Sequence, residues 1–331
     1  MKRKIIYVAM LAVSLISCEK KHFVAEEGGK ETVSLEVRLV SEETKAAGEG
    51  GDEEKAVSDY QVLIYDMSSR MLEAYETPDP AAVSVNMICT TGPKEVVVLA
   101  NAPDAGGIVS YDTFLKTKSR LLDNGIGRLV MEGHAPADLT AAGGTVSVDI
   151  RRVVSKVVLD GITVDFEQEA YDNMDFILRK VYLTNVAADK SYLAETADPV
   201  RWYNQIVRTS APEVDAMLYE ELGNLNIKTT KEYRQKHHFY CCPNPHATDT
   251  FSPDSWSPRP TRLVVEATLG NVPYYYPITL PELKQNTRYY VSLHIVRPGA
   301  TSPEQDMDKY AVSFNIKIEE WKGPVDVSET I

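Results

Sequence analysis

Residues 32–40 alternate between apolar and polar side chains, with Val33, Leu35, Val37 and Leu39 on one parity and Ser34, Glu36 and Arg38 on the other. This period of two predicts a β-strand with one buried face. Similar short runs rich in Val, Thr and Tyr recur along the chain with turn residues between them, and Tyr alone occurs 18 times. Such runs favour strands over helices, so we expect an all-β protein built of antiparallel β-sandwiches.

The strand-like runs divide into two groups. We expect strands at 60–65, 83–88, 95–101, 128–132 and 145–150, with one or two helical turns in 108–124, and further strands at 153–164, 176–186, 237–241, 261–268, 274–280, 289–296 and 310–321. Residues 197–235 are mixed in composition and predict a long excursion with a little helix. A chain of 331 residues accommodates two domains. We place them at 32–152 and 153–331, with the boundary near Arg152.

The N-terminus predicts export. Lys2, Arg3 and Lys4 precede a short apolar run at 5–15, which is too short to span a bilayer. Leu15-Ile16-Ser17-Cys18 is typical of a bacterial lipobox, in which the cysteine thiol takes a diacylglycerol. We expect residues 1–17 to be a cleaved signal peptide, Cys18 to be the lipidated N-terminus and 18–31 to be a tether. An ordinary secretory peptide that ends near a cysteine is the alternative.

Charge and cysteine content exclude some functions. The formal net charge is −13, and removal of residues 1–17, with three positive charges and no negative ones, brings it to −16. Because such a chain repels phosphate backbones, nucleic acid is not an expected partner. After Cys18 only Cys89, Cys241 and Cys242 remain, and three thiols do not make a disulfide framework.

One cluster has metal-ligating residue types: His237, His238, Cys241, Cys242 and His246. Adjacent residues of a strand point to opposite faces, and zinc motifs separate their cysteines by two to four residues, so we predict no metal. A vicinal disulfide between Cys241 and Cys242 is a strained alternative. No nucleophile elbow or phosphate-binding glycine loop is present, so we predict neither an enzyme nor a cofactor.

Taken together, several segments resemble the fimbrillins of Bacteroidota type V pili, the FimA-like and Mfa-like fimbrial subunits. They are the lipobox, the alternating strand before TKAAGEGGDEEK, VSDYQVLIYD, VVVLANAP, IRRVVSKVVLDGITV, AYDNMDFILRKVYLTNV, HFYCCPNP, YYYPITLPELKQNTRYYVSLHIVRPGATSPE and VSFNIKIEEW. The order and spacing of these segments, rather than any one of them, carry the resemblance.

The resemblance implies two transthyretin-like β-sandwiches in tandem. It implies export as a lipoprotein to the outer membrane surface, proteolysis after the first strand, and filling of the vacated site by the C-terminal strand of another subunit in an adhesive fimbrium. The expected partners are other copies or related subunits, the maturation protease, the membrane, and host or bacterial surface ligands. In the family an arginine precedes the cut; here Lys45 precedes Ala46, which leaves the protease open.

The residues agree with this mechanism. The polar, Gly-rich segment 41–55 predicts an exposed, flexible loop suited to proteolysis. Strand 32–40, interpreted as an amphipathic edge segment, would on leaving expose an apolar groove with unpaired backbone groups along both walls. In the tail at 324–331, the candidate donor strand, Val325, Val327 and Ile331 share one parity, which Glu329 interrupts. Pairing of this tail with its own domain is the alternative.

Three functions remain open at this stage. The first is a polymerising shaft subunit, and the second is an anchor or tip subunit of the same fimbria. The third is a surface glycan-binding lipoprotein that would use the aromatic side chains Trp202, Tyr203 and Trp256, for which core or turn packing is the alternative interpretation.

Overall fold

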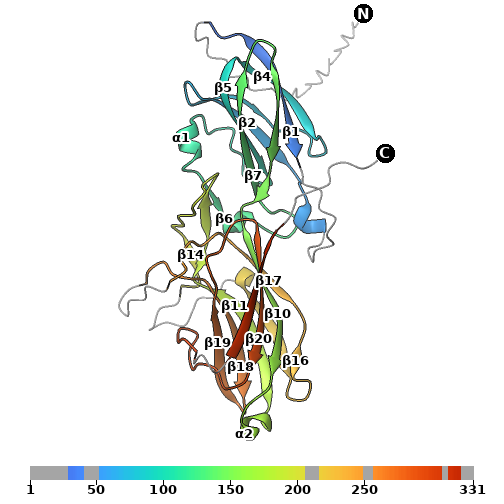
Figure 1. Cartoon of the computed structure of the whole chain (residues 1–331), viewed down its shortest axis with the longest axis vertical. Helices are drawn as coiled ribbons and strands as arrows, with labels where there is room; N and C mark the ends of the chain where they lie inside the picture. Colours follow the sequence, from blue (N-terminus) through green and yellow to red (C-terminus); the bar gives the residue numbers. More distant parts are fainter. Residues whose placement is uncertain (1–28, 41–51, 206–215, 249–255, 308–311, 322–331) are drawn as a thin grey trace, which may run out of the picture.

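The structure, a computed structural model, describes residues 29–40, 52–205, 216–248, 256–307 and 312–321. Within these ranges the chain forms two β-sandwiches placed end to end along the long axis of the molecule (Figure 1). The expected all-β class and tandem arrangement are confirmed. No described helix is long and apolar enough to span a bilayer.

The N-terminal sandwich packs a three-stranded sheet against a five-stranded one. The smaller sheet has the order β4-β1-β8, with β4 at Ser84–Thr90, β1 at Thr32–Val40 and β8 at Gly144–Asp149. The larger sheet has the order β3-β2-β5-β7-β9, with β3 at Met71–Glu76, β2 at Tyr60–Asp66, β5 at Gly92–Ala100, β7 at Met131–Leu139 and β9 at Arg151–Arg152. One hydrophobic cluster lies between these sheets.

The C-terminal sandwich also has two sheets. The first has the order β16-β10-β20-β21, with β16 at Glu232–Tyr233, β10 at Ser155–Val164, β20 at Thr287–Ile295 and β21 at Val312–Glu320, and with β17 at His237–Cys241 also paired to β10. The second has the order β15-β11-β18-β19, with β15 at Tyr219–Asn226, β11 at Phe176–Thr184, β18 at Arg262–Leu269 and β19 at Val272–Thr279.

Several short elements lie outside the four main sheets, and one pair of them joins the two sandwiches. β6 at Lys118–Arg120 pairs with β13 at Asp189–Ser191, and β12 at Val186–Ala187 pairs with β14 at Trp202–Tyr203. The helical pieces are α1 at Tyr111–Phe114, α2 at Glu169–Asp172, and the 3-10 turns η1 at Asp52–Lys55, η2 at Leu121–Asp123 and η3 at Ala216–Leu218. Because β6 and β13 come from different halves of the sequence, their pairing joins the sandwiches through backbone hydrogen bonds.

The sheet that contains β2 and β5 is buried on both faces. Val62 and Ile64 enter the core between the N-terminal sheets, whereas Leu63 and Tyr65 enter a second core. This second core contains Phe114 of α1 and continues into the C-terminal sandwich. Burial on both sides explains why β2 and β5 are continuous apolar runs in the sequence rather than alternating ones.

Four expectations need correction. β1 is not an edge strand but the central strand of its sheet. Segment 197–235 contains β15, and β3 was not predicted at all. The predicted exposed loop 41–55 ends in η1, where Glu54 is buried because its carboxylate pairs with Lys156. Residues 41–51 of that loop lie outside the described ranges.

Candidate assembly site

β1 is held by backbone pairing on both of its sides. It pairs antiparallel with β4, with Val37 opposite Val85, and parallel with β8, with Val37 opposite Val146. Val33, Leu35 and Val37 are 7%, 0% and 0% exposed, and Leu39 is half-buried. The most N-terminal described strand therefore forms the middle of a sheet and much of the core beneath it.

The polar face of β1 is exposed to solvent and makes few bonds. Glu36 accepts hydrogen bonds from Arg38 Nη2 at 2.8 Å and from Thr145 Oγ1 at 3.3 Å. The hydrogen bond from Arg38, which is exposed, lowers the pKa of Glu36, which is half-buried. Exposed pairs of this kind contribute little stability, so β1 is retained by its backbone bonds and its apolar face.

Glu54, which follows β1 in sequence, reaches the C-terminal sandwich. Its Oε1 atom lies 2.5 Å from Lys156 Nζ and accepts a hydrogen bond from the Tyr240 hydroxyl at 2.7 Å. Its backbone carbonyl accepts a bond from Arg152 Nε at 3.0 Å. The Arg152 guanidinium lies 4.6 Å from the ring centre of Trp321, the last described residue of the chain. Burial lowers the pKa of Arg152 to about 10.

These contacts place the end of the predicted loop next to the end of the described chain. No sequence pattern pointed to Glu54, since DEEK is a polar run with no periodicity. Six residues of the sites predicted from the sequence lie outside the described ranges: Cys18, Lys45, Ala46, Val325, Val327 and Ile331.

The histidine and cysteine cluster has no metal-site geometry. His237 is hydrogen bonded to the Tyr233 hydroxyl at 2.7 Å and to a Glu220 carboxylate oxygen. Cys241 and Cys242 are buried free thiols, and burial raises the pKa of Cys241 to about 12. Among the described residues no group of three His, Cys, Asp or Glu side chains is arranged to hold a metal ion.

The aromatic residues proposed for glycan binding are partly buried. The rings of Trp202 and Trp256 lie 5.2 Å apart in an edge-on arrangement, and His246 lies 5.8 Å from Trp202. Trp256 Nε1 donates to Asn185 Oδ1 at 3.4 Å. Trp202 and Tyr203 pack against the large core. Trp202 and Trp256 therefore pack against each other, and Trp202 and Tyr203 pack against the core, rather than forming an open platform.

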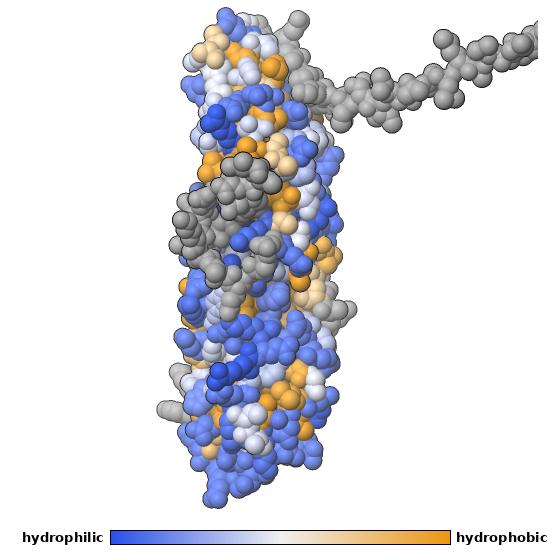
Figure 2. Space-filling model, turned by 90° about the vertical axis from the view of Figure 1, so that its right-hand side faces the viewer, coloured by the Kyte–Doolittle hydropathy of each residue, from blue (hydrophilic) through white to orange (hydrophobic). Residues whose placement is uncertain are grey.

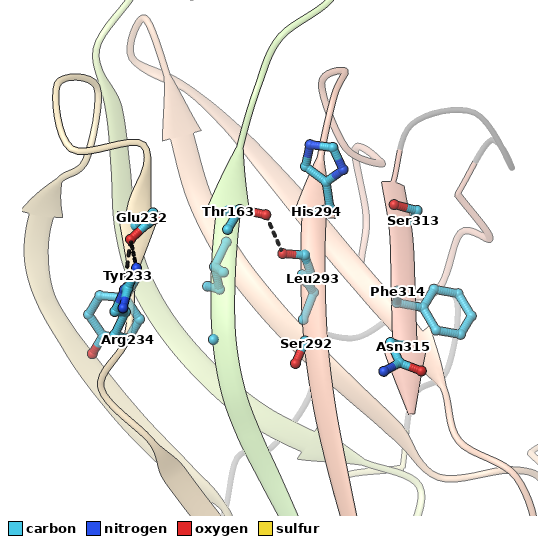
Figure 3. Close-up of a pocket in the computed structure, with 12 residues that line it drawn as sticks. Thr163, Glu232, Tyr233, Arg234, Ser292, Leu293, His294, Ser313, Phe314 and Asn315 are labelled. Carbon is cyan, nitrogen blue, oxygen red and sulfur yellow. Dashed lines mark hydrogen bonds and ion pairs between the residues drawn. The ribbon is translucent and has the colours of Figure 1, made fainter. Parts of the chain in front are cut away.

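A shallow hollow of about 400 Å³ lies on the outer face of the C-terminal sheet (Figure 3). Side chains from β16, β10, β20 and β21 line it, and Thr163 Oγ1 bonds the Leu293 carbonyl at 3.3 Å. His294, Ser313 and Asn315 are exposed there. On the face of the whole molecule drawn in Figure 2, hydrophobic and hydrophilic residues are interspersed. The hollow brings together no base, nucleophile and buried charge that would carry out a reaction.

Comparison with known proteins matches the N-terminal part of the chain to one family model. Residues 32–148 match the family described as major fimbrial subunit protein (FimA). No curated protein is significantly similar to the chain. The family is one of structural subunits rather than enzymes.

Solved structures share the fold along nearly the whole chain. A fimbrilin from Porphyromonas gingivalis has 16% identity and a TM-score of 0.66, covering 88% of this chain and 98% of the other. A Bacteroides eggerthii protein provisionally assigned to cell adhesion has 17% identity and a TM-score of 0.69, covering 89% and 98%. The tip fimbrial protein Mfa3 from Porphyromonas gingivalis has 13% identity and a TM-score of 0.53, covering 88% and 100%.

At these identities the structures establish a common fold, and the match to the family model is confined to residues 32–148. The chain is therefore fimbrillin-like: residues 32–148 match the FimA family of major fimbrial subunits, and the described chain has the fold of a fimbrilin.

Proposed function

We propose that this protein is a structural subunit of a bacterial surface fimbria that polymerises by strand exchange and supports adhesion. A protease removes β1, and the C-terminal strand of a second copy takes its place. The observation that carries this proposal is the position of β1: it is the most N-terminal described strand, yet it is paired on both sides in the centre of a sheet.

The energetics favour replacement of β1 over simple loss. Burial of an aliphatic side chain contributes about 1.5–3 kcal/mol, so Val33, Leu35 and Val37 together contribute on the order of 5–9 kcal/mol as an upper bound. Departure of β1 would also leave unpaired backbone groups on β4 and β8. An exposed pair of strand edges above an apolar floor is a template for an incoming strand.

The proposed cut lies between Lys45 and Ala46. β1 ends at Val40 and η1 begins at Asp52, so a cut at this place separates β1 from the rest of the chain. The buried carboxylate of Glu54 keeps the new N-terminal segment attached to the C-terminal sandwich. After cleavage β1 would be held by non-covalent contacts alone, which a competing strand can displace.

The donor strand, residues 324–331, has one register that suits this site best. Val325 and Val327 would take the places of Leu35 and Val37, which are fully buried, and Glu329 would take the place of half-buried Leu39. The one register of the same parity that overlaps more of β1 puts Glu329 at the site of Val37, which is fully buried, and an unpaired carboxylate there is strongly unfavourable. The donor would run parallel to β8, as β1 does.

Export precedes assembly in this proposal. Residues 1–17 direct secretion, and acyl chains on Cys18 hold the subunit to the outer membrane until cleavage after Lys45 frees it. The partners are other copies or related fimbrial subunits, the maturation protease and the membrane.

The test is limited digestion of the purified full-length protein with a lysine-specific protease, followed by size-exclusion chromatography and N-terminal sequencing. We expect a new N-terminus at Ala46 and conversion of monomers into a ladder of larger species. A Lys45→Gln variant, treated in the same way, should remain monomeric. If completely cleaved wild-type chains stayed monomeric at high concentration, the strand-exchange proposal would be wrong.

A further inference from the structure

Four charged side chains meet at the start of β1, at the end of the N-terminal core. Lys94 Nζ lies 2.5 Å from Asp66 Oδ2 and 2.7 Å from Glu73 Oε2. Lys30, from the residues just before β1, contacts the same Asp66 Oδ2 at 2.7 Å. The side chain of Lys94 is 0% exposed, and those of Asp66 and Glu73 are 8% and 9% exposed. We call these four residues the Lys94 cluster.

The sheet places three members of the Lys94 cluster on one face. Asp66 and Lys94 are directly opposite each other in the antiparallel pair β2–β5. The β2–β3 register shifts between Ile64 and Tyr65, which makes Glu73 the extra residue of a β-bulge. Because a bulge re-aims the side chain that it carries, Glu73 reaches Lys94 from the neighbouring strand.

Hydrogen bonds orient both carboxylates. Asp66 Oδ1 accepts from the backbone N–H groups of Ser68 and Ser69 at 3.0 and 2.9 Å. Glu73 Oε1 accepts from the Thr90 N–H at 2.5 Å, and Thr90 Oγ1 accepts from Lys94 Nζ at 3.0 Å. The other Asp66 oxygen, Oδ2, faces the amine. Two N–H donors on Oδ1 would also stabilise negative charge that develops on this oxygen during attack at the carboxyl carbon.

We propose that Lys94, Asp66 and Glu73 form an autocatalytic isopeptide site, at which the Lys94 amine condenses with the Asp66 carboxyl group to give a covalent amide between β5 and β2.

The reaction needs no external reagent. A proton first passes from the Lys94 ammonium to the Asp66 carboxylate, which turns the ion pair into a neutral amine and a carboxylic acid. Nζ then attacks Cγ of Asp66. Glu73 accepts a proton from the nitrogen and delivers it to the departing hydroxyl group, so that one water leaves and one C–N bond replaces one C–O bond. Glu73 ends in its starting state, as a general acid and base does.

The ionic form dominates before reaction. Burial by itself lowers the pKa of Lys94, but its bonds to Asp66 and Glu73 outweigh burial and raise it. Burial raises the pKa of Asp66, but bonds from Lys30 and Lys94 and from Ser69 N–H outweigh it, so this pKa lies well below its usual range. The neutral pair is therefore the minor form, and Lys30 lowers its population further because its charge favours the carboxylate.

Two other buried lysines provide an internal comparison. Lys156 pairs with Glu54, and Lys190 pairs with Glu132, each at 2.5 Å. In the described part of the chain neither of these amines has a second carboxylate at ion-pair distance. Without that group no neighbouring carboxylate can relay the proton from nitrogen to the leaving hydroxyl, so we expect these two pairs to remain ionic.

Lys30 connects this site to assembly, and this step alone rests on the proposed function. A chain cut after Lys45 that loses β1 also loses Lys30. Removal of its charge favours the neutral form of Asp66 and thus the condensation. The covalent bond would then tie β2 to β5 in the assembled subunit, across a loop of 28 residues.

The experiment is intact mass measurement of the purified full-length protein after complete denaturation, which removes ion pairs but not amide bonds. Wild-type protein and a Lys30→Gln variant are incubated at neutral pH and sampled over days. We expect a fraction lighter by one water molecule, at least twofold larger in Lys30→Gln. Tandem mass spectrometry of the digest should show a branched peptide that joins Lys94 to Asp66.

Variants separate this bond from other causes of mass loss. Glu73→Gln and Lys94→Arg should keep the full mass, with circular dichroism showing that they fold. Asp66→Asn should lose ammonia in place of water, because its leaving group differs. Lys190→Arg is the matched control and should still lose water.

A full, unchanged mass of both wild type and Lys30→Gln would overturn the proposal, as would a branched peptide that joins any other pair. The mass measurement needs no polymer, so its outcome is independent of strand exchange.

Discussion

Glu54 and Lys156 form a buried ion pair between the segment that follows β1 and the first long strand of the C-terminal sandwich. The atoms Oε1 and Nζ lie 2.5 Å apart, and both side chains are 7% exposed. Tyr240 donates to the same Oε1 atom, and burial, with Glu54 beside it, raises the pKa of Tyr240 well above its usual range. The pair therefore anchors the chain immediately after the proposed cleavage loop.

Substitution of Glu54 by alanine should destabilise the protein strongly. Lys156 would remain buried without its partner, and removal of one member of a buried pair costs about 3–5 kcal/mol. Urea denaturation of the unprocessed protein measures this loss. Asp149→Ala is the control, because Asp149 pairs with Arg151 at the surface and should cost less than about 1 kcal/mol. Equal losses in the two variants would show that the buried pair is not a special anchor.

Stability should fall in mild acid because of His238. Burial, and then the charge of Lys156, lower the pKa of His238 below its ordinary value, although Glu54 and Glu220 oppose this shift. The unfolded chain therefore binds a proton that the folded chain does not. Stability is complete above about pH 6.5 and is lost as the pH falls from there through the lower pKa of the folded protein.

Thermal melts of wild type and His238→Gln between pH 7.5 and 5 test this dependence. The variant should lose less stability than wild type over this interval. His294→Gln, a substitution at an exposed site on β20, should follow the wild-type profile. A His238→Gln profile identical to that of wild type would contradict the assignment.

Leu35→Ala should destabilise the uncut chain but not the processed polymer. Leu35 is fully buried, so its truncation should lower the free energy of unfolding of the uncut chain by about 2–5 kcal/mol. In the processed polymer β1 has departed, and the melting temperature should equal that of wild type. Ser34→Ala, on the exposed face, should change neither state. A destabilised polymer would mean that β1 stays in place.

The donor register predicts a parity effect in the C-terminal tail. Val327→Glu would put a carboxylate at the site of Val37, which is 0% exposed, and should abolish polymer formation after cleavage. Ser328→Glu puts the same charge one residue later, on the outward face, and should polymerise like wild type. Size-exclusion chromatography of the cleaved variants measures both. Polymers of Val327→Glu would exclude this register.

Sequence patterns predicted several elements well. β17 begins and ends where it was expected, and the alternation at 32–40 marked β1 and its buried face. β3 was missed because Met, Leu, Glu and Ala in MLEAYE are strong helix formers, and pairing with β2 overrides that preference. β15 was missed because YEELGNLN has no apolar alternation and only Leu222 of its side chains is fully buried.

The sequence alone determines that this protein is an all-β chain with an amphipathic strand at 32–40, because side-chain alternation is a local property that follows directly from strand geometry. The tertiary structure decided that this strand lies between β4 and β8, and that Lys94 faces two carboxylates. Residues far apart along the chain are brought together by the register of the sheet and by a β-bulge. Neither of these features produces a periodic pattern in the sequence from which it could be predicted.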